Sequence, residues 1–149
     1  MKAVVTNVRR ASVTVEGERV ASIGRGFLIL LGVTHGDTEA DCLRLADKIC
    51  SLRIFKDENE RTNLSLSDVS GEVLIVSQFT LYANCRHGRR PDFLAAAKPE
   101  LAVPLYERFC ARVRENGFSV QTGVFGAYME VESVNDGPFT LVIDTEDLQ

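Results

Sequence analysis

The N-terminal part of the chain carries the hydrophobic pattern of β-strands. Valine alternates with serine and threonine over residues 12–15, and residues 3–8 are similarly rich in valine and threonine, so both stretches predict strands. Glu16-Gly17-Glu18 predicts a turn, after which residues 20–23 extend the β region. The next run, at 27–33, has no polar side chain. Such a run is typical of a strand buried on both faces, so we expect it at the centre of a sheet.

Two segments carry the three-to-four-residue spacing of amphipathic helices instead. The first begins near Glu39, after a candidate N-cap at Asp37 or Thr38. Its repeating face is Cys42, Leu45 or Ala46, Ile49, and Leu52 or Arg53. The second opens at Pro99-Glu100 and ends at Asn116-Gly117. Its apolar face is Leu101, Leu105, Phe109 and Val113.

A second buried strand and a β-rich C-terminal part complete the pattern. Residues 72–76 form an apolar run that leads directly into Ser77-Gln78-Phe79-Thr80, and polar residues at the end of a buried strand suit a site. Two or three further strands are expected, at 119–124, 128–134 and 139–143. Strands thus come first and last, with two strand-plus-helix units between them. This order predicts an α/β fold with mixed sheets in a layered, barrel-like arrangement and two main helices on one side, rather than a doubly wound dinucleotide fold.

Composition restricts the possible partners. The chain has 149 residues, of which 45% are hydrophobic, so a single domain spanning 1–149 is expected. Its formal charge is −4, so any nucleic acid has to be held locally. Four cysteines lack a CxxC pair, which favours reduced thiols in the cytoplasm. No apolar run approaches the ~20 residues of a membrane span, so no membrane partner is expected.

Asn135-Asp136-Gly137-Pro138 is the first candidate for function. Its residue types predict a turn between the last two strands, and an ordinary hairpin loop is one interpretation. A cis Gly-Pro bond would instead point two neighbouring carbonyl groups in nearly the same direction. Such rigid, paired carbonyl groups could form a stereochemical gate.

Ser77 and Thr80 are the second candidate, because either hydroxyl could be a nucleophile beside a general base. The only histidines are His35 and His87, and neither lies in a recognised triad setting. The alternative is that both hydroxyls bond to the backbone while Phe79 packs.

The run from 86 to 90 concentrates positive charge, and arginine suits phosphate through its planar donor fork. Its cations are Arg86, Arg89 and Arg90. A solvated basic loop is the competing interpretation. Cys85-x-His87 offers only two potential ligands, so no metal site and no cofactor are expected.

Several ordered strings, taken together, resemble the D-aminoacyl-tRNA deacylase family from end to end. They are Leu31-Gly32-Val33-Thr34-His35-Gly36-Asp37, Leu52-Arg53-Ile54-Phe55, Asn63-Leu64-Ser65-Leu66, Ser77-Gln78-Phe79-Thr80-Leu81-Tyr82-Ala83, Gly88-Arg89-Arg90-Pro91, Leu105-Tyr106-Glu107-Arg108-Phe109 and Asn135-Asp136-Gly137-Pro138.

The resemblance implies a homodimer in which a cis Gly137-Pro138 of one subunit enters the active site of the other, beside the residues Ser77, Gln78, Phe79 and Thr80. It also implies that Phe125 and Met129 line the pocket for the terminal adenosine of tRNA. The family usually carries an arginine, thought to brace the Gly-Pro turn, where this chain has Asn7. Arg9 or Arg10 could compensate.

The implied activity is hydrolysis of the ester bond in D-aminoacyl-tRNA. The ester of glycine mischarged on the tRNA for alanine would be hydrolysed as well. L-substrates would be rejected by backbone carbonyl groups, and the substrate's own 2′-hydroxyl would assist water while backbone donors near Phe79 and Thr80 stabilise the oxyanion. Two other classes stay open from the residues alone: a small-ester hydrolase with a Thr80 or Ser77 nucleophile, and a non-catalytic RNA-binding module.

Overall fold

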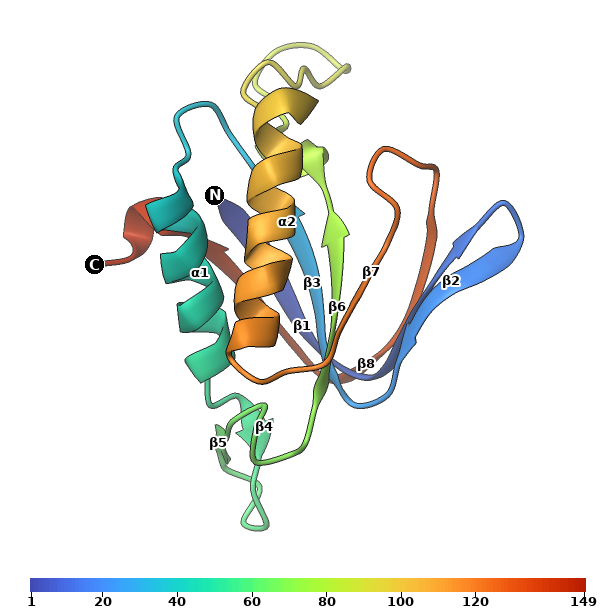
Figure 1. Ribbon diagram of the computed structural model, residues 1–149, viewed down its shortest axis with the longest axis vertical. Coiled ribbons are helices and arrows are strands. Elements are labelled where there is room, and N and C mark those ends of the chain that lie inside the picture. The colour runs from blue at the N-terminus through green and yellow to red at the C-terminus, as the bar shows by residue number, and fades with distance from the viewer.

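A strongly bent mixed sheet carries two helices against one face (Figure 1). The computed structural model describes residues 1–149. The elements are β1 Lys2–Val15, β2 Glu18–Ile23, β3 Gly26–Gly32, α1 Glu39–Ser51, β4 Phe55–Lys56, β5 Thr62–Leu64, β6 Glu72–Ser77, the 3₁₀ turn η1 Phe79–Tyr82, α2 Pro99–Glu115, β7 Val120–Thr122, β8 Glu130–Asp144 and the 3₁₀ turn η2 Thr145–Asp147.

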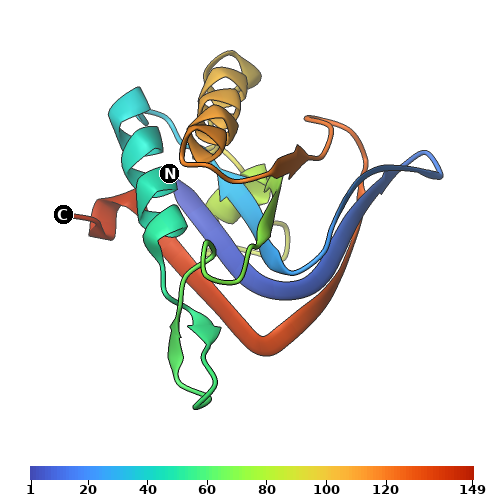
Figure 2. The ribbon, with the colours of Figure 1, turned by 60° about the horizontal axis from the view of Figure 1, so that its bottom comes forward.

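β1 is the strand around which the sheet is organised. One of its edges pairs with β3 along its first half and with β2 along its second half, both antiparallel. Its other edge pairs with β8, and β1 and β8 bend together (Figure 2). β6 lies parallel to β3, and β7 lies parallel to β6. The backbone N–H of Ser22 in β2 donates to Gln121 Oε1 in β7 at 2.8 Å, so the sheet curls toward the predicted barrel-like shape.

The helices begin and end where the sequence predicts. Thr38 caps α1 in a reciprocal capping box with Asp41, and Pro99 occupies the first turn of α2, where its missing N–H costs nothing. α1 lies in the connection between the parallel strands β3 and β6, and α2 lies in the connection between the parallel strands β6 and β7. Parallel neighbours need such crossover connections. Arg112 of α2 binds both carboxylate oxygens of Asp47 in α1, at 2.7 and 2.9 Å. Neither helix is long and apolar enough to cross a membrane.

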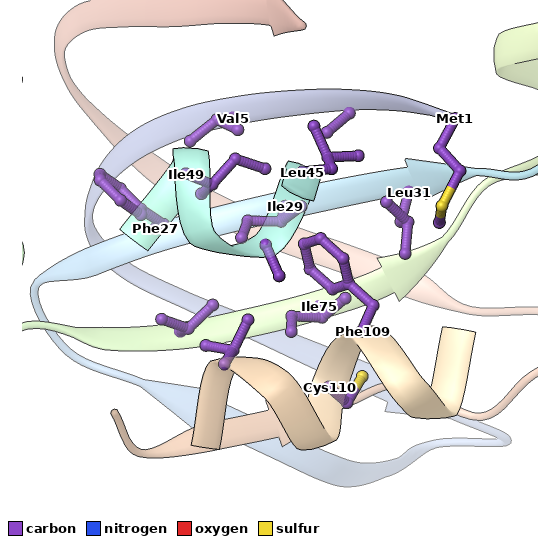
Figure 3. Packing of buried hydrophobic residues seen from close by; sticks show 14 of the residues in the cluster. Met1, Val5, Phe27, Ile29, Leu31, Leu45, Ile49, Ile75, Phe109 and Cys110 are labelled. Carbon is purple, nitrogen blue, oxygen red and sulfur yellow. The ribbon is translucent and has the colours of Figure 1, made fainter. Parts of the chain in front are cut away.

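The main core of 22 buried residues lies between the sheet and the helices. Phe109 of α2 points toward Ile75 of β6, and Leu45 and Ile49 of α1 lie near Ile29 of β3 (Figure 3). A second cluster of eight buried residues fills the other side of the bent sheet. Alternate residues of β3 and β6 belong to the two clusters, which confirms that both strands are buried on both faces.

Two divisions between predicted strands were wrong, and one hairpin was missed. Residues 3–8 and 12–15 belong to one continuous strand of 14 residues, β1. The strands expected at 128–134 and 139–143 are likewise one strand, β8. The hairpin formed by β4 and β5 went unpredicted because its strands have only two and three residues, too few to display a period.

Asn135-Asp136-Gly137-Pro138 is therefore no hairpin loop. Thr6 pairs with Thr140 and Val8 pairs with Asn135, so β1 has one residue, Asn7, where β8 has the four residues 136–139. The segment is a wide bulge within one strand, and it marks a sharp bend in β8 (Figure 2). The Gly-Pro pair broke the alternation of the sequence without reversing the chain.

Candidate active site

β6 delivers Ser77 to the edge of the sheet, and a tight packing contact holds the residues that follow. The backbone N–H of Gln78 donates to Leu31 O of β3 at 2.8 Å. Gly32 then passes directly beneath η1: a Cβ at this position would lie 3.2 Å from Gln78 O and 3.1 Å from Leu81 Cβ. The absence of a side chain at Gly32 thus lets η1 approach β3.

Neither hydroxyl of this string has a base beside it. The side-chain amide of Gln78 donates to Thr80 Oγ1, and no carboxylate or imidazole bonds to Ser77 or Thr80. The ring of His35 is held against Leu94 O, with 2.9 Å between Nε2 and that oxygen. Burial raises the pKa of the Tyr82 phenol, which therefore stays protonated at neutral pH. The arrangement does not support a serine- or threonine-nucleophile hydrolase.

The buried thiols are equally unsuited to nucleophilic chemistry. Burial raises the pKa of Cys42 to about 12 and that of Cys110 to about 11. Both thiols are therefore protonated at neutral pH, whereas the thiolate is the reactive form. No group of three or more His, Cys, Asp or Glu side chains is arranged so that it could hold a metal ion.

Two open cavities flank Phe79. One, of about 360 Å³, is mainly apolar and includes Phe93, whose ring meets Phe79 edge-on at 5.1 Å between centroids. The other, of about 280 Å³, includes Gln78 and Met129. Both cavities share Ser77, Phe79, Phe125 and Gly126. The structure thus brings the predicted adenosine-pocket residues Phe125 and Met129 together with the Ser77 string; Phe93 and Gly126 carried no signal in the sequence.

The β8 bulge lies at a different place in the chain. Ser77 pairs with Leu31 at one end of β3, whereas Asn7, opposite the bulge, pairs with Phe27. Four residues along β3 and three strand spacings give a separation of about 20 Å along the sheet, at ~3.3 Å per residue and ~4.8 Å per strand. Within one chain, the Ser77 string and Gly137-Pro138 do not form one site.

The bulge itself borders the largest cavity, of about 540 Å³. The peptide bond between Gly137 and Pro138 is cis, as the resemblance implies, and both residues are exposed. Gly137 has φ +134°, and a Cβ there would lie 2.8 Å from Phe139 N, so this conformation requires glycine. Asn135 Oδ1 accepts a hydrogen bond from Ser133 Oγ at 2.8 Å.

Asn7 faces inward opposite the bulge. Its side-chain amide donates to Ile54 O at 2.7 Å, and its Oδ1 is the only buried side-chain oxygen or nitrogen without a hydrogen-bond partner. Of the two arginines that could compensate, Arg9 lies at ion-pair distance, with its Nε 3.6 Å from Asp136 Oδ1. Arg10 borders a separate groove and makes no ion pair.

The basic loop extends beyond the same end of the sheet as Ser77 (Figure 1). It is closed by a pair of backbone hydrogen bonds between Asn84 and Asp92, of 2.8 and 3.1 Å. Thr34 Oγ1 donates to Ala95 O at 2.5 Å and fastens the loop to the end of β3. Its cations, Arg86, Arg89 and Arg90, are exposed.

Comparison with known proteins shows which family the chain belongs to. The model of the D-Tyr-tRNA(Tyr) deacylase family matches residues 4–144. A D-aminoacyl-tRNA deacylase of Thermus aquaticus is 58% identical over 99% of this chain and 97% of its own length. The chain belongs to the D-aminoacyl-tRNA deacylase family. A second member, from Chloroflexus aurantiacus, is 58% identical over the whole of this chain and 93% of its own length.

Solved structures of similar proteins have the same fold. A c-Myc DNA unwinding element binding protein superimposes with a TM-score of 0.90 and 42% identity, covering 97% of this chain and 98% of that one. A probable eukaryotic D-amino acid tRNA deacylase has a TM-score of 0.80 over 95% of this chain and 97% of its own, with 20% identity; it supports the fold alone. The predicted deacylase family and α/β fold are both confirmed.

Proposed function

We propose that this chain, as a D-aminoacyl-tRNA deacylase, hydrolyses the ester that links a D-amino acid to the terminal adenosine of tRNA and releases the free amino acid and tRNA. The observation that carries the proposal is an aromatic-lined pair of cavities at the Ser77 string in a chain of this family. The reduced thiols expected from the sequence suit a cytoplasmic enzyme, where charged tRNA is present.

The chemical step relies on positioning rather than on a protein nucleophile. The backbone N–H groups of Phe79 and Thr80, the first two residues of η1, donate to no acceptor in the chain. Aimed at the ester carbonyl, they would stabilise the oxyanion. With no base beside Thr80, the 2′-hydroxyl of the terminal adenosine assists the attacking water. Phe125 and Met129 hold the adenosine, while Arg86, Arg89 and Arg90 contact tRNA phosphates.

A homodimer completes the site. Gly137-Pro138 lies about 20 Å from Ser77 along the sheet of its own chain, so only a second copy can supply it there. β8 pairs with β1 alone and leaves its outer edge free over 15 residues. Such a long free edge is normally covered. Val142 on this strand and Tyr128 just before it are 74% and 88% exposed, consistent with a surface that a partner covers.

The bulge then acts as a chiral gate. The exposed Gly137-Pro138 backbone occupies the space into which an L-side chain would project, so every L-residue is rejected whatever its side chain. Backbone atoms suit this task because no side-chain substitution removes them. Glycine has no side chain to exclude, so the ester of glycine mischarged on the tRNA for alanine is also hydrolysed.

The decisive experiment measures hydrolysis of paired D- and L-aminoacyl-tRNAs by the purified protein. We expect rapid loss of the D-ester and negligible loss of the L-ester. Equal rates on both would refute the proposal. A light-scattering mass of one chain, rather than two, would refute the shared site.

The mechanism has a separate test. Thr80→Ala should retain substantial turnover because its hydroxyl takes no part in the chemistry, whereas a D-aminoacyl-tRNA ending in 2′-deoxyadenosine should be stable. Loss of turnover in Thr80→Ala together with cleavage of the deoxy substrate would reverse the assignment and restore Thr80 as the nucleophile.

A further inference from the structure

Three cations surround the largest cavity, the one that the β8 bulge borders, and this cavity lies outside the site built around Ser77. Arg9, Arg25 and Lys56 all line it, and Asp136 is the only acidic residue among its lining residues. The local charge is therefore 3 − 1 = +2 in a chain with a formal charge of −4. The cavity is a local exception to the acidity of the chain.

The donors of these cations are largely uncommitted. The Arg25 guanidinium lies over the ring of Phe55, with 5.2 Å between Cζ and the ring centroid, and forms no side-chain hydrogen bond. The other ring in this stack is Phe27, parallel to Phe55 within 10°, so Arg25 rests on a rigid platform. Lys56 forms no ion pair. Arg9 Nε lies 3.6 Å from Asp136 Oδ1, too far for a hydrogen bond.

We propose that Arg9, Arg25 and Lys56 form a phosphate-binding site for the 3′ strand of the tRNA whose terminal adenosine lies in the partner's active site. The inference rests on the proposed function and on its dimer. When the bulge enters the partner's site, it brings this cavity to the mouth of that site. The RNA strand leaving the terminal adenosine then meets the three cations.

The chemistry of the cavity fits an RNA strand. Arginine presents a planar fork to phosphate and lysine a mobile point charge. The subunit that supplies the gate therefore also grips the substrate.

A charge-removal experiment tests the site. The triple variant Arg9→Gln/Arg25→Gln/Lys56→Gln is compared with Arg19→Gln/Lys48→Gln/Arg114→Gln, which removes the same charge at exposed positions outside the lining of this cavity. With D-aminoacyl-tRNA, we expect the first variant to raise KM about tenfold with kcat within twofold, and to flatten the salt dependence of kcat/KM by about one to two log units per decade of salt. The control variant should match the wild type.

Mixed dimers show which subunit supplies the cations. In one mixed dimer, a Phe79→Ala subunit is paired with a triple-variant subunit. The only intact active site then consists of the cavities of the triple-variant subunit and the gate and cations of the Phe79→Ala subunit. Because those cations are unaltered, we expect a wild-type KM. In the other, the Phe79→Ala substitution and the triple variant share one subunit and the partner is wild type; we expect the raised KM. The reverse pattern would show that each chain grips its own tRNA, and would overturn the proposal.

The remaining outcomes separate this proposal from the proposed function. Failure of the wild type to cleave D-aminoacyl-tRNA would remove the function itself. Cleavage by the wild type, with unchanged KM and salt dependence in the triple variant, would refute only the proposed phosphate-binding site. Inorganic phosphate that competes at constant ionic strength as well as deacylated tRNA does would assign the cavity to a free anion instead. Arg9→Gln/Lys56→Gln leaves Arg25 on Phe55 and replaces the triple variant if that variant unfolds.

Discussion

Replacing Gly32 with alanine tests how the sheet positions the active site. The added Cβ would meet Leu81 Cβ at 3.1 Å, Gln78 O at 3.2 Å and Tyr82 Cδ2 at 3.3 Å. The first two neighbours are backbone or are bonded directly to it, so they cannot rotate away. η1 must therefore move by a few tenths of an ångström, and Gln78, Phe79 and Thr80 move with it.

The expected magnitude follows from the cost of overpacking, about 1–3 kcal/mol. For a domain of this size, 1 kcal/mol corresponds to about 2–4 °C in Tm, so we expect Gly32→Ala to lower Tm by about 2–12 °C. A misplacement of 1 Å at an active site can cost about 100-fold in rate. A shift of a few tenths of an ångström should therefore lower kcat/KM for D-aminoacyl-tRNA about 3- to 10-fold.

Calorimetry and single-substrate kinetics measure the two effects, and Gly24→Ala is the matched control. A Cβ at Gly24 would meet only Glu72 Oε1, at 3.3 Å, the end of a flexible side chain. We expect its Tm to stay within about 2 °C of the wild type, with unchanged kcat/KM. Full activity in Gly32→Ala, or an unchanged Tm, would show that η1 does not depend on this contact.

Three further substitutions test the frame of the molecule. Tyr106→Phe removes the hydroxyl that donates to Ile75 O at 2.7 Å, while the N–H of Gly123 still donates to the same oxygen at 3.3 Å; chemical denaturation should show a loss of about 0.5–1.5 kcal/mol, and an unchanged midpoint would contradict this. Phe109→Ala empties a fully buried position and should cost about 3–5 kcal/mol in the same assay. Hydrogen bonds from Arg112 hold the pKa of Asp47 below its usual value, so this carboxylate contributes stability above its unfolded pKa and loses it as pH falls through the folded pKa. Asp47→Asn should therefore flatten the acid side of the stability profile below about pH 4, and an unaltered profile would argue against it.

Local chemistry explains what could be predicted from the sequence. Thr38 and Pro99 identify the helix starts because capping and first-turn preferences are local. β3 was placed at the sheet centre because only a strand covered on both faces is apolar at consecutive positions. The Ser77 string was proposed as a site because polar residues follow a buried strand, and the structure places cavities beside it.

The shape of β8 could not be predicted because strand register is a property of two distant segments. Nothing near Gly137 shows that Asn7 alone faces four residues. The same limit applies to the cationic cavity: Arg25 precedes β3 and Lys56 ends β4, and only the fold brings them together. Neither residue lies in a recognisable motif, whereas the basic loop at 86–90 is visible as a run of charge.

Charge placement connects the proposed gate with the proposed phosphate site. A chain with a formal charge of −4 attracts tRNA only where cations are concentrated. One concentration is the basic loop at 86–90, beyond the end of the sheet where Ser77 lies, and the other lies beside Gly137-Pro138. In an isolated chain, cations beside the bulge would draw RNA away from the catalytic cavities. In the proposed dimer, the bulge of one subunit meets the Ser77 string of the other, and both concentrations of charge face the same RNA strand. In that proposed dimer, the separation of the Ser77 string from Gly137-Pro138 within one chain would let the two chains bind the substrate from both sides.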